Sequence, residues 1–377
     1  MKILMVLTYY YPRWTGLTAY ARRLAEGLAE RGHQVTVLTS QHSPDLSREE
    51  VHKGVRIVRL KHWMRVSRGV VMPSFPFVAY RLIREHDVVQ LHTPLMESPL
   101  LTTLAKVAGK KVLFTHHGDL VMPEGLFDQA VERAVTWLMT QALKGSARIS
   151  IHSKDYADHS AFLSPFKEKL AYIYPPIEIP LPVPGDVAAW REELGAERCK
   201  LVGFAGRFVE EKGFDFLLKS IPYVVESMPD VKFVYAGDTR VVYESFYEKW
   251  EHLVKAWREH IVLLGLVRDP QKLANFYAMC DVFALPSRTD CFPSVQVEAM
   301  LCGTPVVATD IPGGRVPVSL TQMGLLVPPQ DERALAEGLL TVLEGAQRFV
   351  KSRAEIEALF SLRRTVDEYE ELLRSLV

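Results

Sequence analysis

Short apolar segments alternate with amphipathic segments along almost the whole chain. The first apolar segment, Lys2–Leu7, is followed by a turn-rich stretch, after which Tyr20, Leu24 and Leu28 recur at helical spacing until Arg31-Gly32. Further strands are predicted at 35–38, 55–60, 87–91, 111–115 and 147–151, and a long helix at about 126–143. Because parallel strands need long crossover connections, this alternation favours βαβ units in a parallel sheet.

The composition changes between Tyr174 and Pro184, where the sequence YPPIEIPLPVP contains five prolines. Such a stretch cannot continue a helix or a central strand, so it indicates a stiff linker or, alternatively, a proline-rich surface loop within one domain. A second alternating series follows. Its predicted strands are 201–205, 231–236, 261–265, 282–285, 305–308 and 325–327, and its helices include 215–228, 242–259 and 270–279.

A chain of 377 residues is too long for one ordinary core. The two series predict an α/β fold of two Rossmann-like, doubly wound parallel-sheet domains that face a central cleft, where open sheets bind ligands. We expect an N-terminal domain at 1–176, a linker at 177–198, a C-terminal domain at 199–358 and a C-terminal helix at 359–377. That helix is amphipathic, with Val366, Tyr369 and Leu373 on one face.

Charge and composition narrow the class of function. Lysine and arginine total 45 and so do aspartate and glutamate, which argues against a general nucleic-acid binder. No apolar run approaches the roughly 18 residues that a membrane span needs, and the N-terminal run is too short for a signal peptide, so we expect a cytoplasmic protein. The four cysteines show no zinc-like spacing and are expected to be reduced core thiols.

A diphosphate site is predicted where the first strand of the second series ends. Gly206 and Arg207 follow that strand, and Lys212 precedes a predicted helix. Two cations beside a helix N-terminus suit a diphosphate, because the amides and the side chains both favour anions. The alternative is that Arg207 and Lys212 are solvated partners of Glu210 and Glu211.

A second candidate segment runs from Pro286 to Gly314. The backbone around a predicted helix start could hold phosphate oxygens, and it comprises Phe292, Pro293, Ser294 and Val295. Glu298 could accept hydrogen bonds from ribose hydroxyls, and Asp290 could reach a donor sugar. Alternatively, both acids only decorate a loop and a first helical turn.

Two further candidates lie in the first series. Gly16 is in the loop between the first strand and helix, where a backbone approaches a ligand closely, and the aromatic residues beside it could stack on a sugar or cover the wall of the cleft. His117 or His116, at the end of the strand 111–115, could hydrogen-bond a sugar hydroxyl, although a strand-end histidine is more often structural.

Several motifs are missing. No two aspartates are spaced as DxD, so the usual divalent-metal site of many nucleotide-sugar enzymes is not predicted. The sequence also lacks GxxxxGK[ST], HExxH, GxSxG and a GxGxxG after the first strand, which weakens kinase, zinc hydrolase, serine hydrolase and dehydrogenase hypotheses.

Together these segments resemble the retaining glycosyltransferases of family 4, which have the GT-B fold. The resemblance covers essentially the whole chain and is strongest between 203 and 329. It rests on Gly206-Arg207 with Lys212, on Pro286-Ser287, on Asp290 and Glu298 with the tail EAMLCGTPVVA, and on GLLVP at 324–328. It implies that the N-terminal domain at 1–176 binds the acceptor and that the C-terminal domain at 199–358 binds the nucleotide sugar. It also implies that the C-terminal helix packs back toward the N-terminal domain and that no cofactor is used.

The resemblance also implies a role for each candidate. Arg207 and Lys212 would neutralise the departing diphosphate, while Glu298 would bind the ribose and the backbone from 292 to 295 would hold the phosphate. Asp290 and His117 would contact the transferred sugar, Gly16 would let its loop close over the phosphates, and Arg268 would lie near the base. Aspartate in place of the usual glutamate at 290, and Thr15 in place of a glycine before Gly16, are departures from the family pattern.

The predicted reaction is the metal-independent, retaining transfer of a hexose of mannose or glucose type from a GDP- or UDP-linked sugar. A lipid-linked glycan or glycolipid of surface polysaccharide assembly is the expected acceptor. The segment 61–77 mixes Lys61, Arg65 and Arg68 with Trp63, Met64, Val66, Val70 and Val71, which suits either contact with an anionic membrane or an ordinary acceptor-side loop and helix. The competing hypotheses are a sugar-nucleotide epimerase, a phosphorylase and a non-catalytic sugar-binding protein.

Overall fold

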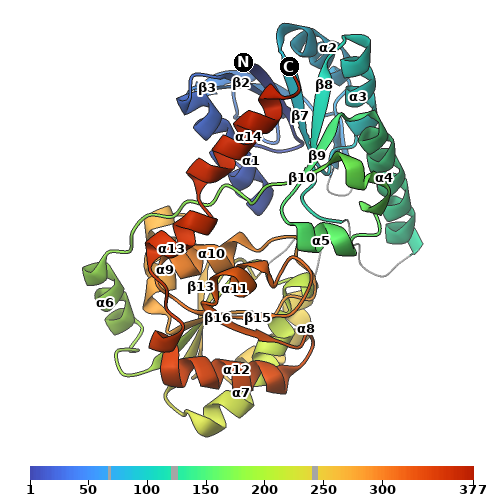
Figure 1. Ribbon diagram of the computed structural model, residues 1–377. Helices are drawn as coiled ribbons and strands as arrows, with labels where there is room; N and C mark the ends of the chain where they lie inside the picture. The colour runs from blue at the N-terminus through green and yellow to red at the C-terminus, as the bar shows by residue number, and fades with distance from the viewer. Residues whose placement is uncertain (67–68, 120–125, 240–244) are drawn as a thin grey trace. The chain divides into compact units, whose positions relative to one another are not determined.

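The computed structural model describes residues 1–66, 69–119, 126–239 and 245–377. The chain forms two compact units (Figure 1). Unit 1 consists of Met1–Pro176 together with Leu362–Val377, and unit 2 consists of Ile177–Ser361. Both are α/β units built on a mostly parallel sheet, as the alternation of apolar and amphipathic segments predicted.

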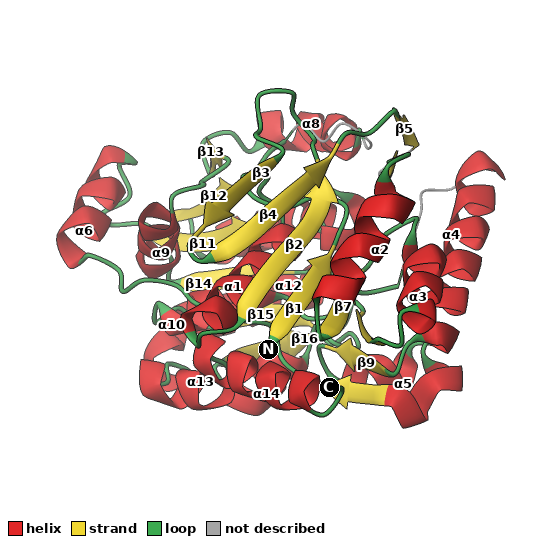
Figure 2. Ribbon diagram, turned by 90° about the horizontal axis from the view of Figure 1, so that it is seen from above, coloured by secondary structure: helices red, strands yellow, loops and turns green. Residues whose placement is uncertain are grey.

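Unit 1 contains a sheet with the strand order β10-β9-β8-β7-β1-β2-β4-β3. The strands are β1 (Lys2–Val6), β2 (Gln34–Ser40), β3 (Glu49–His52), β4 (Val55–Leu60), β7 (Val88–His92), β8 (Lys111–Thr115), β9 (Arg148–Ile151) and β10 (Leu170–Tyr172). Figure 2 shows β1, β2 and β4 side by side. Of these strands only β3 pairs antiparallel, with β4 at the edge. Strands β5 (Met64–Val66) and β6 (Gly69–Val71) form a separate hairpin.

The helices of unit 1 are α1 (Gly16–Glu30), α2 (Phe75–Glu85), α3 (Ser98–Val107), α4 (Leu126–Gly145), α5 (Lys154–His159) and α14 (Leu362–Arg374). Helix α1 begins at a capping box in which Thr15 and Thr18 bond each other's backbone amides. Its buried face carries Tyr20, Leu24 and Leu28, the residues whose spacing predicted it. The core beneath combines this face with the apolar residues of β1 and β2.

Unit 2 contains a six-stranded parallel sheet with the order β13-β12-β11-β14-β15-β16. Its strands are β11 (Lys200–Ala205), β12 (Val231–Ala236), β13 (Ile261–Gly265), β14 (Val282–Leu285), β15 (Val306–Thr309) and β16 (Gly324–Val327). Its helices are α6 (Pro184–Glu193), α7 (Phe214–Ser227), α8 (Phe246–Ala256), α9 (Pro270–Met279), α10 (Ser294–Leu301), α11 (Val316–Thr321), α12 (Glu332–Gly345) and α13 (Arg353–Leu359).

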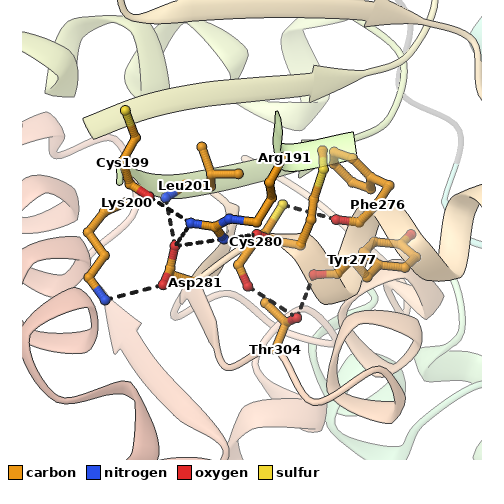
Figure 3. Close-up of polar contacts among 10 residues, drawn as sticks. Arg191, Cys199, Lys200, Leu201, Phe276, Tyr277, Cys280, Asp281 and Thr304 are labelled. Atoms are coloured by element: carbon orange, nitrogen blue, oxygen red, sulfur yellow. Dashed lines mark hydrogen bonds and ion pairs between the residues drawn. The ribbon is translucent and has the colours of Figure 1, made fainter. Parts of the chain in front are cut away.

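Residues 177–198, which the proline content assigned to a linker, belong to unit 2. They include α6, which begins at Pro184, and Figure 3 shows how this helix is attached. The Arg191 guanidinium donates to the backbone oxygens of Met279 and Cys199 and lies 3.4 Å from the Asp281 carboxylate, which also accepts a 2.9 Å bond from the Leu201 amide. A proline at the start of a helix is compatible with this, since the first helical amide needs no partner.

The helix predicted at 359–377 corresponds to α14. Helix α13 ends at Leu359, Phe360 and Ser361 are not helical, and α14 begins at Leu362. Helix α14 packs on α1, where the Tyr369 hydroxyl lies 2.5 Å from that of Tyr20 and donates to Ser150 Oγ at 3.0 Å. The expected return of the C-terminal helix to the N-terminal unit is therefore confirmed. Across the described ranges, no helix combines the length and the apolar character needed to cross a membrane.

Candidate functional site

In unit 2, two loops meet where β11 and β14 end. Residues Gly206–Gly213 follow β11, and Gly213 has φ +67° as it turns the chain into α7. A Cβ atom on Gly213 would lie 1.8 Å from the carbonyl oxygen of Pro286, which follows β14. Only glycine fits this position, because it accepts positive φ and leaves room for the neighbouring backbone.

The ion pair between Lys212 and Asp290 joins the two loops. The Lys212 Nζ atom lies 2.5 Å from Asp290 Oδ2, and the two side chains are 22% and 11% exposed. The predicted diphosphate ligand Lys212 and the predicted sugar contact Asp290 are thus brought together. The alternative, in which Lys212 pairs with Glu210 or Glu211, does not describe the structure, because the partner of Lys212 is Asp290.

Arg207 forms an ion pair with Glu211, with Nη2 2.7 Å from Oε1. These side chains are 48% and 37% exposed, so the pair is accessible to solvent. Arg207 therefore pairs with a neighbouring glutamate, as the alternative interpretation of the sequence predicted. Exposed pairs of this kind contribute little to stability, so an incoming anion can compete with Glu211 at small cost.

Arg288 connects the same two loops, and no pattern in the sequence indicated it. Its guanidinium donates 2.8 Å bonds to both carboxylate oxygens of Asp215 and a 2.7 Å bond to the Glu210 carbonyl. Its backbone amide donates to the Glu211 carbonyl at 2.8 Å. Asp215 is buried at the start of α7 and is 73 residues from Arg288 along the chain, so no local spacing in the sequence indicated this pair. The bidentate bond holds the loop that carries Lys212 in register.

Glu298 lies on α10, and its carboxylate accepts a 3.1 Å hydrogen bond from the Tyr277 hydroxyl of α9. Glu298 is almost completely buried. Helix α10 begins at Ser294 after Pro293 and has no side-chain cap, while Phe292 packs against Phe360. Residues Phe292 to Val295, which lead into α10 and form its first turn, come directly after the loop that carries Asp290. Arg268 is exposed in the segment after β13.

In unit 1, His117 follows β8 and lies in a cluster of aromatic side chains. Its Nε2 atom is 3.0 Å from Nδ1 of His92, and its ring meets Tyr20 edge to face with centroids 4.7 Å apart. The ring of His152 lies 5.2 Å away. Burial lowers the pKa of His117, and it lowers the pKa of His92 to about 3, so both rings are neutral at pH 7. The sequence pattern did not indicate His92 or His152.

His116, the other histidine considered, bonds Asp119 Oδ1 at 2.9 Å and is fully buried, which indicates a structural role. Gly16 is the first residue of α1 and is exposed. A Cβ atom there would meet no atom within 4 Å, so the fold itself does not require glycine at this position.

The candidates thus form two groups. Gly16, His116 and His117 belong to unit 1, and the candidates for binding the diphosphate, the ribose and the base belong to unit 2. Among the residues that the structure describes, histidine, cysteine, aspartate and glutamate form no group of three or more that could hold a metal ion. Metal independence stays a prediction.

Comparison with known proteins covers both units. Residues 15–176 match the model of the glycosyl transferase 4-like domain, and residues 199–345 match that of glycosyl transferases group 1. The chain is 31% identical to the phosphatidyl-myo-inositol mannosyltransferase of Mycobacterium leprae, over 94% of this chain and 91% of that protein. It is 27% identical to a D-inositol 3-phosphate glycosyltransferase of Segniliparus rotundus, over 93% of this chain and 82% of that protein.

Solved structures with this architecture include HepE of Anabaena in complex with UDP and glucose, with a TM-score of 0.81, 20% identity and 100% of both chains covered. Sucrose-phosphate synthase of Thermosynechococcus elongatus has a TM-score of 0.78 at 21% identity, with 100% of this chain and 98% of that chain covered. The similarity to these solved structures supports the two-domain fold, and the sequence matches identify the family. The chain belongs to the group 1 glycosyltransferases of the family 4 type, with the GT-B fold.

Proposed function

We propose that this glycosyltransferase moves a hexose of mannose or glucose type from a GDP- or UDP-linked sugar to an acceptor hydroxyl, with retention of configuration and without a metal ion. The observation that carries the proposal is the Lys212–Asp290 pair, which joins two loops at the carboxyl ends of β11 and β14. A cation and an acid held at this edge of a parallel sheet suit a diphosphate and its attached sugar.

In this proposal Lys212 and Arg207 bind the diphosphate and release Asp290 and Glu211, their partners in the free protein. Gly206 and the backbone from 292 to 295 lie against the phosphates. Glu298 accepts from the ribose hydroxyls, Asp290 contacts the transferred sugar and Arg268 lies near the base. From unit 1, His117 donates or accepts at a sugar hydroxyl and Gly16 lets its loop approach the phosphates.

The bond change follows from charge. The acceptor hydroxyl oxygen bonds to the anomeric carbon on the face from which the bond to the diphosphate oxygen breaks, and the hydroxyl proton passes to that departing oxygen. Negative charge grows on the diphosphate during this step. Fixed cations stabilise it because they are already oriented when the charge develops. The absence of a DxD motif supports transfer without a divalent metal.

We also propose a lipid-linked acceptor reached from an anionic membrane surface. Trp63 and Phe77 are 79% and 80% exposed, and Lys61 and Arg65, each two residues from Trp63 in the sequence, are exposed too. Exposed aromatic and basic residues suit the interface of an anionic bilayer. Val70 is buried and does not take part, and Arg68 lies outside the described residues.

A thermal-shift screen with UDP, GDP and their hexose conjugates tests the donor. The matching nucleotide should raise the midpoint of unfolding, since a ligand that binds only the folded state stabilises it by mass action. The anomeric configuration of the product, read by NMR, tests retention, and undiminished turnover in EDTA tests metal independence. Failure of every nucleoside diphosphate to bind would contradict the proposal.

A further inference from the structure

A second histidine, from the neighbouring strand, is hydrogen-bonded to the proposed sugar contact His117. His92 is the last residue of β7, and His117 comes two residues after β8, which pairs with β7 in parallel. Nδ1 of His92 lies 3.0 Å from Nε2 of His117, and the two ring planes are inclined by 24°. Within the described residues, His92 is the only hydrogen-bond partner of the His117 ring. The function proposed above gives His92 no role.

The orientation of the His117 ring is fixed by the side chains around it. Tyr20 meets this ring edge to face, with planes inclined by 87°. Tyr20 is itself held by α14, because its hydroxyl group is bonded to that of Tyr369. The ring of His152 packs 5.2 Å from His117. A ring packed on several sides does not turn over freely, so Nε2 keeps facing His92 and Nδ1 is the nitrogen that can meet a ligand.

The position of the proton between His92 and His117 follows from burial. Both rings are neutral at pH 7, since burial lowers the pKa of each. A neutral imidazole carries one N–H group and one lone pair, so a single proton lies between His92 Nδ1 and His117 Nε2. The other nitrogen of His92, Nε2, is buried and has no hydrogen-bond partner among the described residues. A buried N–H group without an acceptor is rarer than a buried lone pair without a donor, which assigns the proton of His92 to Nδ1.

We propose that His92 is a positioning residue that donates its Nδ1 proton to Nε2 of His117 and thereby holds His117 in the tautomer with its own proton on Nδ1. The inference rests on the proposed contact between His117 and the transferred sugar, and it specifies the nitrogen and the direction of that hydrogen bond. His117 presents an N–H donor to a hydroxyl oxygen of the sugar. A donor that is fixed in advance needs no reorientation when the sugar binds.

The same tautomer limits what His117 can do in the reaction. Its one lone pair, on Nε2, already accepts the proton of His92. His117 therefore cannot take the proton of the acceptor hydroxyl group as a general base. This agrees with the bond change proposed above, in which that proton passes to the departing diphosphate oxygen.

Two-bond proton–nitrogen correlation spectra of the histidine rings measure the tautomers in the free protein. The proposal predicts Nδ1–H for both His92 and His117, whereas the reverse hydrogen bond would give Nε2–H for both. The signals are assigned by their loss in His92→Asn and in His117→Asn. Nε2–H on either ring would overturn the proposal. The spectra need no donor, so they remain decisive even if no hexose donor is used, an outcome that contradicts only the function proposed above.

Turnover measures whether the hydrogen bond positions His117. His92→Leu should lower kcat about tenfold with almost unchanged KM for the donor, because one oriented hydrogen bond is lost from the transition state. His92→Asn keeps an amide N–H donor close to the former Nδ1 and should recover most of the rate. If His92→Leu does not fold, the spectra of the wild type and the rate of His92→Asn still decide.

The matched control is His86→Leu. His86 precedes β7, at the opposite end of this strand from His92, and it too is buried. Its ring is hydrogen-bonded to the carbonyl oxygen of Leu82 at 2.6 Å and to Thr36 Oγ1 at 2.8 Å. The control should lose stability but keep the kcat of the wild type while it is folded. An unchanged kcat in His92→Leu, an equal loss in His86→Leu, or no recovery in His92→Asn would each overturn the proposal.

Discussion

Lys212 is the residue on which the proposed chemistry depends most directly. Its ammonium group already faces a carboxylate at 2.5 Å, so it is oriented before any donor arrives. Replacement of Lys212 by alanine should slow turnover by roughly 10²–10³, as expected for the loss of one preorganised charge stabiliser. Initial-rate measurements with the identified donor check this. Lys255→Ala removes a lysine from an exposed pair with Glu251 and should leave the rate unchanged. A near-normal rate for Lys212→Ala would exclude Lys212 from the reaction.

Gly213 and Gly16 make a second comparison at single residues. Gly213→Ala forces alanine into positive φ and against the Pro286 carbonyl, so urea denaturation should show a loss of at least about 1–2 kcal/mol in the free energy of unfolding. Gly16→Ala meets no neighbour and should stay within about 0.5 kcal/mol of the wild type. If Gly16 lets its loop approach the donor, Gly16→Ala should nevertheless bind the nucleotide sugar more weakly. Wild-type stability of Gly213→Ala would contradict the packing argument.

The sequence was informative about residues whose role depends on local spacing. Lys212 and Glu298 stand at fixed offsets from strand ends, and these offsets bring them to the edge of one sheet. Their partners could not be predicted in the same way. Tyr277, Arg288 and His92 meet Glu298, Asp215 and His117 only after distant segments have packed, and a single sequence carries no signal for such pairs.

Among the elements, the buried parallel strands were predicted best, because strands covered on both faces are continuous apolar runs. Strand β7, for example, is buried at every position. Strand β3 was missed since it is short, polar and at the edge of the sheet, and α2 was missed since prolines stand at its start. Prolines also concealed α6 in the segment taken for a linker.

Helix α14 is held to unit 1 by charge as well as by its apolar face. Glu370 accepts bonds from Arg374 and from Arg31, and it lies 3.1 Å from His33. Hydrogen bonds from Arg374, Arg31 and His33 lower the pKa of Glu370 to about 2. A carboxylate whose pKa falls on folding stabilises the folded state above its ordinary pKa of about 4.5 and loses this effect as pH falls toward 2.

Glu370→Gln should therefore be less stable than the wild type at pH 6.5, and this difference should shrink progressively below about pH 4.5. Chemical denaturation at pH 6.5 and 3.5 measures it. Glu371→Gln, an exposed glutamate on the same helix, is the control and should leave stability almost unchanged at both values. A difference between Glu370→Gln and wild type that stays constant across this range would show that the depressed pKa does not contribute.

On the scale of the whole molecule, two exposed aromatic residues flank the hairpin along the chain: Trp63 precedes β5, and Phe77 lies in the first turn of α2. Trp63→Ser with Phe77→Ser should reduce co-sedimentation with vesicles that contain 30% phosphatidylglycerol, because the two side chains would no longer enter the interface. Trp137→Ser is the control, since Trp137 is 61% exposed on α4. Binding that is unchanged in the double variant, or reduced equally by Trp137→Ser, would argue against membrane contact through this segment.

The two series of strands in the sequence predicted two domains. They did not predict that Leu362–Val377 belongs to unit 1. Periodicity showed that the last segment is an amphipathic helix. It could not show on which of the two units that helix packs, because the apolar face of an amphipathic helix can pack on many apolar surfaces. The resemblance to the family supplied that information, and contacts such as that between Val366 and the backbone at Gly27 explain it physically.

The place of α14 has a consequence for synthesis. Unit 2 is one continuous stretch and can fold on the ribosome soon after Ser361 has emerged, while unit 1 must wait for Leu362–Val377 although its sheet was made first. Until then the nascent chain exposes the surface around Tyr20 and Gly27 that α14 covers. Release of a prematurely terminated chain therefore leaves the earlier-made half unfinished, with an apolar surface that invites chaperones or aggregation.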